Sequence, residues 1–132
     1  MVRQYNEGLT DEDLKKLPVS QFAGRIVVVD RLDKFYPILS DLKKSKLLGF
    51  DTETKPSFKK GQKNRVSLLQ LADDHQAWIF RLNTIGLPQE LADILSDPAI
   101  TKVGVAIHDD IKALRSLKQF EPAGFIDLQS IV

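Results

Sequence analysis

Short runs rich in branched and aliphatic side chains recur along the chain, and segments of helical periodicity separate several of them. Such runs, bounded by turn residues, predict strands. Strands are expected over residues 26–29, 47–53, 66–71, 77–80, 102–107 and 125–128. The polar segment 73–76 between the third and fourth strands predicts a hairpin turn.

Apolar residues at helical spacing predict three helices in the intervals between strands. They are expected after Asp33, between Pro88 and Asp97, and from Asp109 to Lys118. This order of elements, with strands early in the chain and then strands that alternate with helices, predicts an α/β fold. In such a fold, helices cover both faces of a mixed sheet. Residues 1–20 are expected to form a polar lead-in or short helix, and residues 21–132 are expected to form the domain.

Composition narrows the possible partners and compartment. The 132 residues, 42% of them hydrophobic, suffice for one core. Nineteen basic against eighteen acidic residues leave a net charge of +1, so any affinity for nucleic acid must come from a local patch. The chain has no cysteine, which excludes disulfides and thiolate metal sites, and it has no apolar run long enough to span a membrane. An intracellular, cytoplasmic location is expected.

The triplet Asp51-Thr52-Glu53 is the first candidate for chemistry. Side chains alternate across a strand, so the two acids project from one face and Thr52 from the other. Two neighbouring carboxylates repel each other unless a cation lies between them, and Mg²⁺ prefers such oxygen ligands. The alternative is an edge strand on which both acids are solvated.

A second acidic segment runs from a buried strand into a helix. Helical spacing places Asp110 on the same side as Leu114, so its carboxylate is expected to face the sheet. Asp109 suits a capping or first-turn position, and His108 is either a ligand or base, or structural.

The two segments together resemble motifs of the DEDD 3′–5′ exonucleases, in the RNase D and Werner-type branch. Residues 50–53 resemble the first motif and residues 107–114 the second. Residues 24–29 and 66–71 are similar to strands of that branch. The chain departs from the pattern where Asp109 replaces the glycine before the second-motif acid and Lys112 replaces an aromatic residue.

This resemblance implies an RNase H-like fold and four carboxylates that hold two divalent cations, Mg²⁺ or Mn²⁺. Asp51, Glu53 and Asp110 would be three of the four and would form the catalytic site. The implied reaction removes nucleoside monophosphates from the 3′ end of DNA or RNA.

The third motif of the family, a Tyr or His followed by the fourth acid, is absent from residues 1–132. Both tyrosines, Tyr5 and Tyr36, precede the first motif, and Asp127 is expected to be structural. A fragment of a longer protein is therefore favoured over an intact protein with an incomplete site. Weak or absent hydrolysis is expected from this chain alone.

A basic loop follows the first motif and contains no acid. The candidate nucleic-acid-binding residues are Lys55, Lys59, Lys60, Lys63 and Arg65. Cations at these positions would contact phosphates without reading sequence, and Phe58 could stack on a base. The alternative is a solvated loop with an incidental aromatic residue.

Three functions remain open from the sequence. The first is a metal-dependent 3′–5′ exonuclease domain, and the second is a non-catalytic nucleic-acid-binding module of the same fold. The third is a protein-interaction domain whose acids only solubilise the surface. Oligomeric state and the choice between DNA and RNA are not encoded in these patterns.

Overall fold

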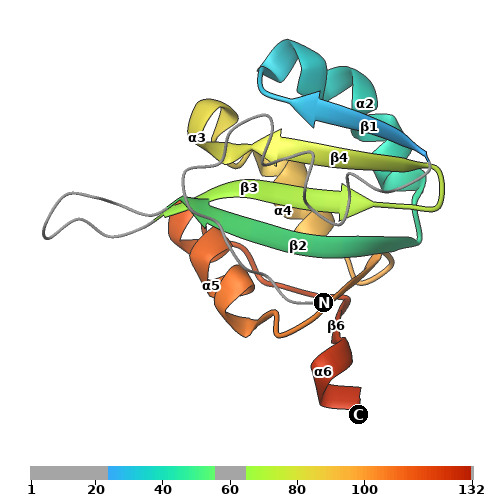
Figure 1. Ribbon diagram of the computed structural model, residues 1–132, viewed down its shortest axis with the longest axis vertical. Helices are drawn as coiled ribbons and strands as arrows, with labels where there is room; N and C mark the ends of the chain where they lie inside the picture. The colour runs from blue at the N-terminus through green and yellow to red at the C-terminus, as the bar shows by residue number, and fades with distance from the viewer. Residues whose placement is uncertain (1–23, 56–64, 132) are drawn as a thin grey trace, which may run out of the picture.

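Six strands form one mixed sheet in the computed structural model, which describes residues 24–55 and 65–131 (Figure 1). The strands are β1 (Arg25–Val29), β2 (Leu47–Lys55), β3 (Arg65–Ala72), β4 (Gln76–Arg81), β5 (Thr101–Gly104) and β6 (Phe125–Asp127). Their order in the sheet is β1-β4-β3-β2-β5-β6. β3 is antiparallel to both β2 and β4, whereas the β1–β4, β2–β5 and β5–β6 pairs are parallel. The predicted α/β class and mixed sheet are confirmed.

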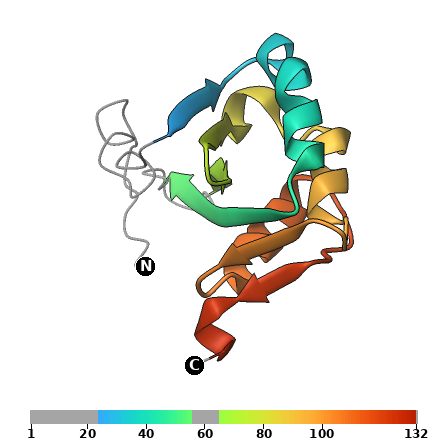
Figure 2. The same cartoon turned by 90° about the vertical axis from the view of Figure 1, so that its right-hand side faces the viewer.

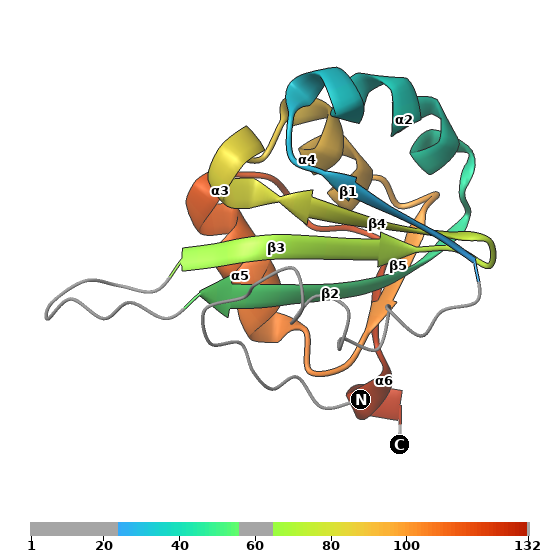
Figure 3. The same ribbon diagram turned by 45° about the horizontal axis from the view of Figure 1, so that its top comes forward.

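Five helices connect or follow these strands in the described ranges. They are α2 (Leu32–Lys44), α3 (Leu82–Ile85), α4 (Gln89–Leu95), α5 (His108–Leu117) and α6 (Leu128–Ile131). The three longer ones, α2, α4 and α5, contribute buried side chains to one core cluster on a single face of the sheet (Figures 2 and 3). The sequence had predicted helices on both faces. None of the described helices is long and apolar enough to cross a lipid bilayer.

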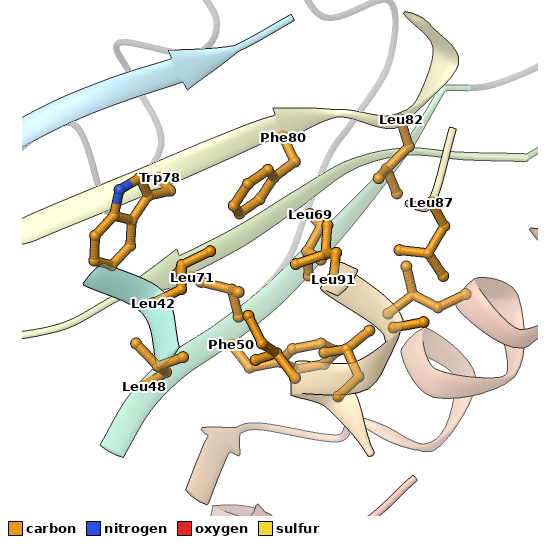
Figure 4. Packing of buried hydrophobic residues seen from close by; sticks show 14 of the residues in the cluster. Leu42, Leu48, Phe50, Leu69, Leu71, Trp78, Phe80, Leu82, Leu87 and Leu91 are labelled. Atoms are coloured by element: carbon orange, nitrogen blue, oxygen red, sulfur yellow. The ribbon is translucent and has the colours of Figure 1, made fainter. Parts of the chain in front are cut away.

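The core lies between that sheet face and the helices. Leu69 and Leu71 of β3 alternate with residues on the other face and pair with Phe80 and Trp78 of β4 (Figure 4). Leu91 of α4 packs against this layer and is fully buried. Because alternate side chains of each strand point to opposite faces, one register fixes the whole apolar layer.

The predicted hairpin between β3 and β4 is confirmed. The Asp73 N–H donates to the Gln76 carbonyl at 2.9 Å, and the Asp73 carboxylate accepts from the His75 N–H at 2.8 Å. An aspartate that bonds to the backbone two residues ahead is typical of a tight turn. The lead-in helix predicted before Pro18 lies outside the described residues.

β5 is shorter than predicted and ends at Gly104. Two residues later, Ala106 has a φ of 54°, a left-handed conformation that no strand continues through. The chain reverses there and enters α5 at His108. The predicted strand over residues 102–107 is therefore correct only in its first half.

Lys102 of β5 is a cation buried inside this framework, with no exposed surface. Its Nζ donates to the carbonyls of Ile94 at 2.8 Å and Asp97 at 2.9 Å and lies 5.2 Å from the centre of the Phe125 ring. Burial lowers the pKa of this ammonium to about 8, and the Asp97 carboxylate opposes part of the shift. Lys102 thus joins the end of α4 to β5 and β6.

Candidate active site

The candidate site forms where β2 and β5 end. The two strands are parallel, so their carboxyl ends point the same way, and β5 pairs only with Leu47–Gly49 of β2. The rest of β2 continues past the end of β5, and the chain leaving β5 turns into α5 beside it. Ligands of α/β sheets commonly bind at such carboxyl ends.

Close packing at this edge requires a glycine in β5. A Cβ on Gly104 would lie 2.7 Å from the carbonyl oxygen of Phe50 and 2.6 Å from the Ile107 side chain. The segment that leads into α5 therefore approaches the residue directly before Asp51. Gly104 brings the two candidate motifs together.

The acids of β2 are not both solvated, although they lie beyond Leu47–Gly49, the part of β2 that pairs with β5. The side chain of Asp51 is half-buried, and that of Glu53 is only 2% exposed. The Asp51 carboxylate accepts a hydrogen bond from the Thr52 N–H at 2.9 Å. The burial of Glu53 contradicts the alternative in which both acids are solvated.

Asp110 faces the sheet, as the helical spacing predicted. It is 4% exposed and lies on the same side of α5 as the fully buried Leu114. The Thr52 hydroxyl donates a hydrogen bond to its Oδ1. The second candidate motif therefore contacts the first through Thr52, the residue between Asp51 and Glu53.

The sequence did not predict a role for Thr52. Alternation along β2 placed it on the face opposite the two acids. Phe50, two residues earlier, belongs to the core that the helices cover, so Thr52 faces α5 as well. Combining strand alternation with the side of the sheet that α5 covers would have revealed the contact.

Asp51, Glu53 and Asp110 have the right donor chemistry for a hard divalent cation, since carboxylate oxygens are the ligands that Mg²⁺ prefers. Within the described ranges, however, no three Asp, Glu, His or Cys side chains gather into a group that could hold a metal ion. The metal-binding role of the three acids stays a prediction.

Asp127 stabilises the backbone ahead of α5. Its carboxylate accepts hydrogen bonds from the N–H groups of Ala106 at 2.9 Å and Ile107 at 3.2 Å, and from that of Gln129 at 2.9 Å. Desolvation raises the pKa of Asp127, but these backbone hydrogen bonds outweigh it, and the pKa falls below its ordinary value. Asp127 thus has the structural role that was expected.

Gln70 is a second polar residue that the sequence did not single out. It pairs with Asp51 across the β2–β3 ladder, so the two side chains share a face. Gln70 is 7% exposed, and its buried amide nitrogen has no hydrogen-bond partner among the described residues. The register between β2 and β3 is the observation that associates Gln70 with the site.

The predicted basic residues are only partly described. Arg65 is exposed at the start of β3, opposite Lys55 at the end of β2. Lys59, Lys60 and Lys63, as well as the side chain of Lys55, lie outside the described residues. A nucleic-acid-binding role for the five residues remains a prediction.

The sequence profile of the 3′–5′ exonuclease family matches residues 26–131 of this chain. The chain is 30% identical over 100 residues to the bifunctional 3′–5′ exonuclease/ATP-dependent helicase WRN of Mus musculus, covering 71% of this chain and 7% of that protein. Among solved structures, Trypanosoma brucei RNase D in complex with RNA U12 matches with a TM-score of 0.69 and 25% identity, over 82% of this chain and 39% of that one.

The EXD2 exonuclease domain soaked in Mg and GMP matches with a TM-score of 0.67 and 30% identity, over 82% of this chain and 58% of that one. The chain spans less than half the length of the curated relatives that it matches. The matched fold agrees with the mixed sheet and helices described above. From the extent of the profile match, the chain belongs to the 3′–5′ exonuclease family.

Proposed function

We propose that the protein hydrolyses phosphodiester bonds at the 3′ end of DNA or RNA with the help of Mg²⁺ or Mn²⁺. The observation that carries the proposal is the hydrogen bond from Thr52 to Asp110. It joins the two motif segments at the carboxyl ends of β2 and β5, in a chain that belongs to this family.

Asp51, Glu53 and Asp110 are the proposed metal ligands and catalytic residues. When bound, two divalent cations would activate a water molecule and stabilise the leaving 3′ oxygen. Thr52 holds the Asp110 carboxylate in one orientation, and burial of Glu53 keeps water from screening its charge. The EXD2 structures soaked in Mg and in Mn support the choice of ions.

The proposed substrate is a nucleic-acid strand with a free 3′ hydroxyl. One relative was crystallised in complex with RNA, which supports an RNA substrate. Another is named as both an exonuclease and a helicase, and its name states no substrate. Arg65 and the lysines at positions 55, 59, 60 and 63 are proposed to contact the phosphates of the strand.

The test is a degradation assay with single-stranded RNA and DNA that carry a 5′ fluorophore. Stepwise shortening from the 3′ end in Mn²⁺, with release of nucleoside monophosphates, is expected. Glu53→Gln and Asp110→Asn should each abolish it, since each keeps the shape of the side chain and removes a ligand charge. Residual shortening at the wild-type rate in both variants would contradict the proposal.

A second function, a non-catalytic nucleic-acid-binding module, is favoured by one observation. In the part of the chain that the structure describes, no three potential ligands form a metal-binding group. This function predicts that the chain binds single strands in Mn²⁺ without shortening them. Isothermal titration with Mn²⁺ separates the two functions. Only the exonuclease requires the chain to bind Mn²⁺ at the site, and Glu53→Gln should then remove this binding.

A further inference from the structure

The outer side of α5 lines a groove that the candidate active site does not use. Its volume is about 650 Å³. Seven residues line it: His108, Ile111, Lys112, Arg115, Ser116, Gln119 and Pro122. Helical spacing puts this side of α5 opposite Asp110, which faces the sheet.

We propose that this groove binds phosphate groups of a nucleic-acid strand, a proposal that rests on the substrate class of the proposed function. Two cations, Lys112 and Arg115, line the groove, and no acid does. Lys112 is exposed and Arg115 is half-buried, so both are within reach of a ligand in the groove. Cations on such a surface can bind the backbone phosphates of a nucleic-acid strand, and these contacts do not depend on the nucleotide sequence.

The guanidinium group of Arg115 makes no short hydrogen bond in the described part of the chain. Its Nε is buried and has no hydrogen-bond partner in the described part of the chain. Its Nη2 makes only long contacts, at 3.3 Å to the Gln119 amide oxygen and at 3.7 Å to Glu121. Because the Nε has no exposed surface, a phosphate would bind at the end of the guanidinium group, where these long contacts leave Nη2 available to an oxyanion.

The ion pair with Glu121 does not block the groove. The Glu121 side chain is 92% exposed, and such a pair contributes little to stability. A phosphate would compete for Arg115 through the planar, two-pronged contact that guanidinium groups make with oxyanions. Glu121 lies outside the groove lining and can remain solvated when a ligand binds.

The lining residues extend along most of α5, from His108 to Ser116. α5 has ten residues, and an α-helix of that length spans about 15 Å. Because α5 carries Asp110 on its inner side, a strand in the groove lies one helix diameter from the candidate site. The groove would therefore hold a part of the strand distinct from the 3′ end.

The test measures binding without hydrolysis, by fluorescence anisotropy of a labelled single-stranded RNA in EDTA at several salt concentrations. The double variant Lys112→Ala/Arg115→Ala is expected to bind roughly tenfold more weakly at 100 mM salt. The slope of log affinity against log salt should fall by about 1.4, since each lost phosphate contact on a single strand removes about 0.7.

The matched control is Lys43→Ala/Lys44→Ala, which removes two exposed cations from the end of α2, away from α5 (Figure 1). It should bind like wild type. Lys112→Glu, at an exposed position, provides a second weakened variant if the loss of Arg115 impairs folding. Circular dichroism melting of every variant verifies the fold.

Equal affinity and slope in wild type and the groove variants would overturn the proposal, as would no binding of RNA by wild type. Preferential binding of a polyglutamate peptide over RNA would also overturn it and indicate an acidic protein partner instead. The degradation assay is independent of these outcomes. A chain that binds RNA through the groove without shortening it would overturn only the proposed hydrolysis.

Discussion

The Thr52 hydroxyl donates a hydrogen bond to the Asp110 carboxylate, and the two residues are 58 positions apart in the chain. Both side chains are buried, Thr52 to 2% exposure and Asp110 to 4%. A buried carboxylate depends on its donors because water is not there to replace them. This contact therefore stabilises the fold as well as orienting the acid.

Replacing Thr52 by valine is expected to lower the free energy of unfolding by about 1.5–3 kcal/mol. Valine keeps the shape of threonine but removes the donor, and hydrogen bonds to charged groups have values in this range. Urea unfolding at 25 °C measures the change. Thr52→Ser keeps the hydroxyl and should lose less; equal stabilities of Thr52→Val and wild type would refute the role of the contact.

Lys102 makes the stability depend on pH in the alkaline range. Its pKa falls from 10.5 to about 8 in the folded protein, chiefly because the ammonium is buried. Below about pH 8 both states hold the proton, and the folded protein carries the full cost of burying the charge. Between about pH 8 and 10.5 the unfolded chain holds more protons, so the free energy of unfolding rises with pH.

The expected rise is at most about 3 kcal/mol, from the size of the pKa shift. A neutral amine still has two donors for the carbonyls of Ile94 and Asp97, so these hydrogen bonds persist. Urea unfolding at pH 7, 8, 9 and 10, of wild type and of Lys102→Met, isolates the contribution of this lysine. A difference between the two proteins that stays constant with pH would contradict the prediction.

Much of the fold follows from local patterns in the sequence. The branched runs located all six strands, and the polar turn at residues 73–76 identified the hairpin. The spacing of Asp110 and Leu114 correctly oriented α5. These features depend on neighbours in sequence, which periodicity records directly.

Features that depend on the arrangement of whole elements were not predictable in this way. One face of the sheet receives α2, α4 and α5, and no local pattern states which face a helix covers. The contact of Thr52 with Asp110 follows from that choice, and the pairing of Gln70 with Asp51 follows from the strand register. The early end of β5 was missed because alanine, at position 106, is not a typical turn residue.

Ala106 is expected to be a source of strain that glycine relieves. Its φ of 54° is in the left-handed region, where a Cβ costs about 1 kcal/mol. The side chain is exposed, so Ala106→Gly loses no packing. The free energy of unfolding should rise by up to about 0.5 kcal/mol, because the greater freedom of glycine in the unfolded chain offsets at least about 0.4 kcal/mol of the relieved strain.

Urea unfolding of Ala106→Gly provides the measurement, with Ala113→Gly as the matched control. Ala113 lies inside α5, where the same change should lower stability by about 1 kcal/mol or more. Opposite signs for the two substitutions are the expected result. A loss of stability in Ala106→Gly would mean that the turn before α5 is not strained.

Gln70→Met is expected to stabilise the fold by about 1 kcal/mol. The buried amide nitrogen of Gln70 has no hydrogen-bond partner among the described residues, and such a group costs about 1–3 kcal/mol. Methionine has a similar length and fills the same space without a polar donor. Urea unfolding measures the gain, and Ser67→Ala is the control, because the Ser67 hydroxyl donates to the Glu53 carbonyl at 3.2 Å.

The control should lose stability, since it removes a hydrogen bond that is made, whereas Gln70→Met removes a donor that is not used. A polar group retained at a cost beside Asp51 is typical of a site kept for function. We therefore expect Gln70→Met, although more stable, to degrade RNA or DNA more slowly than wild type in the Mn²⁺ assay. Greater stability with undiminished hydrolysis would show that Gln70 serves neither substrate nor Asp51.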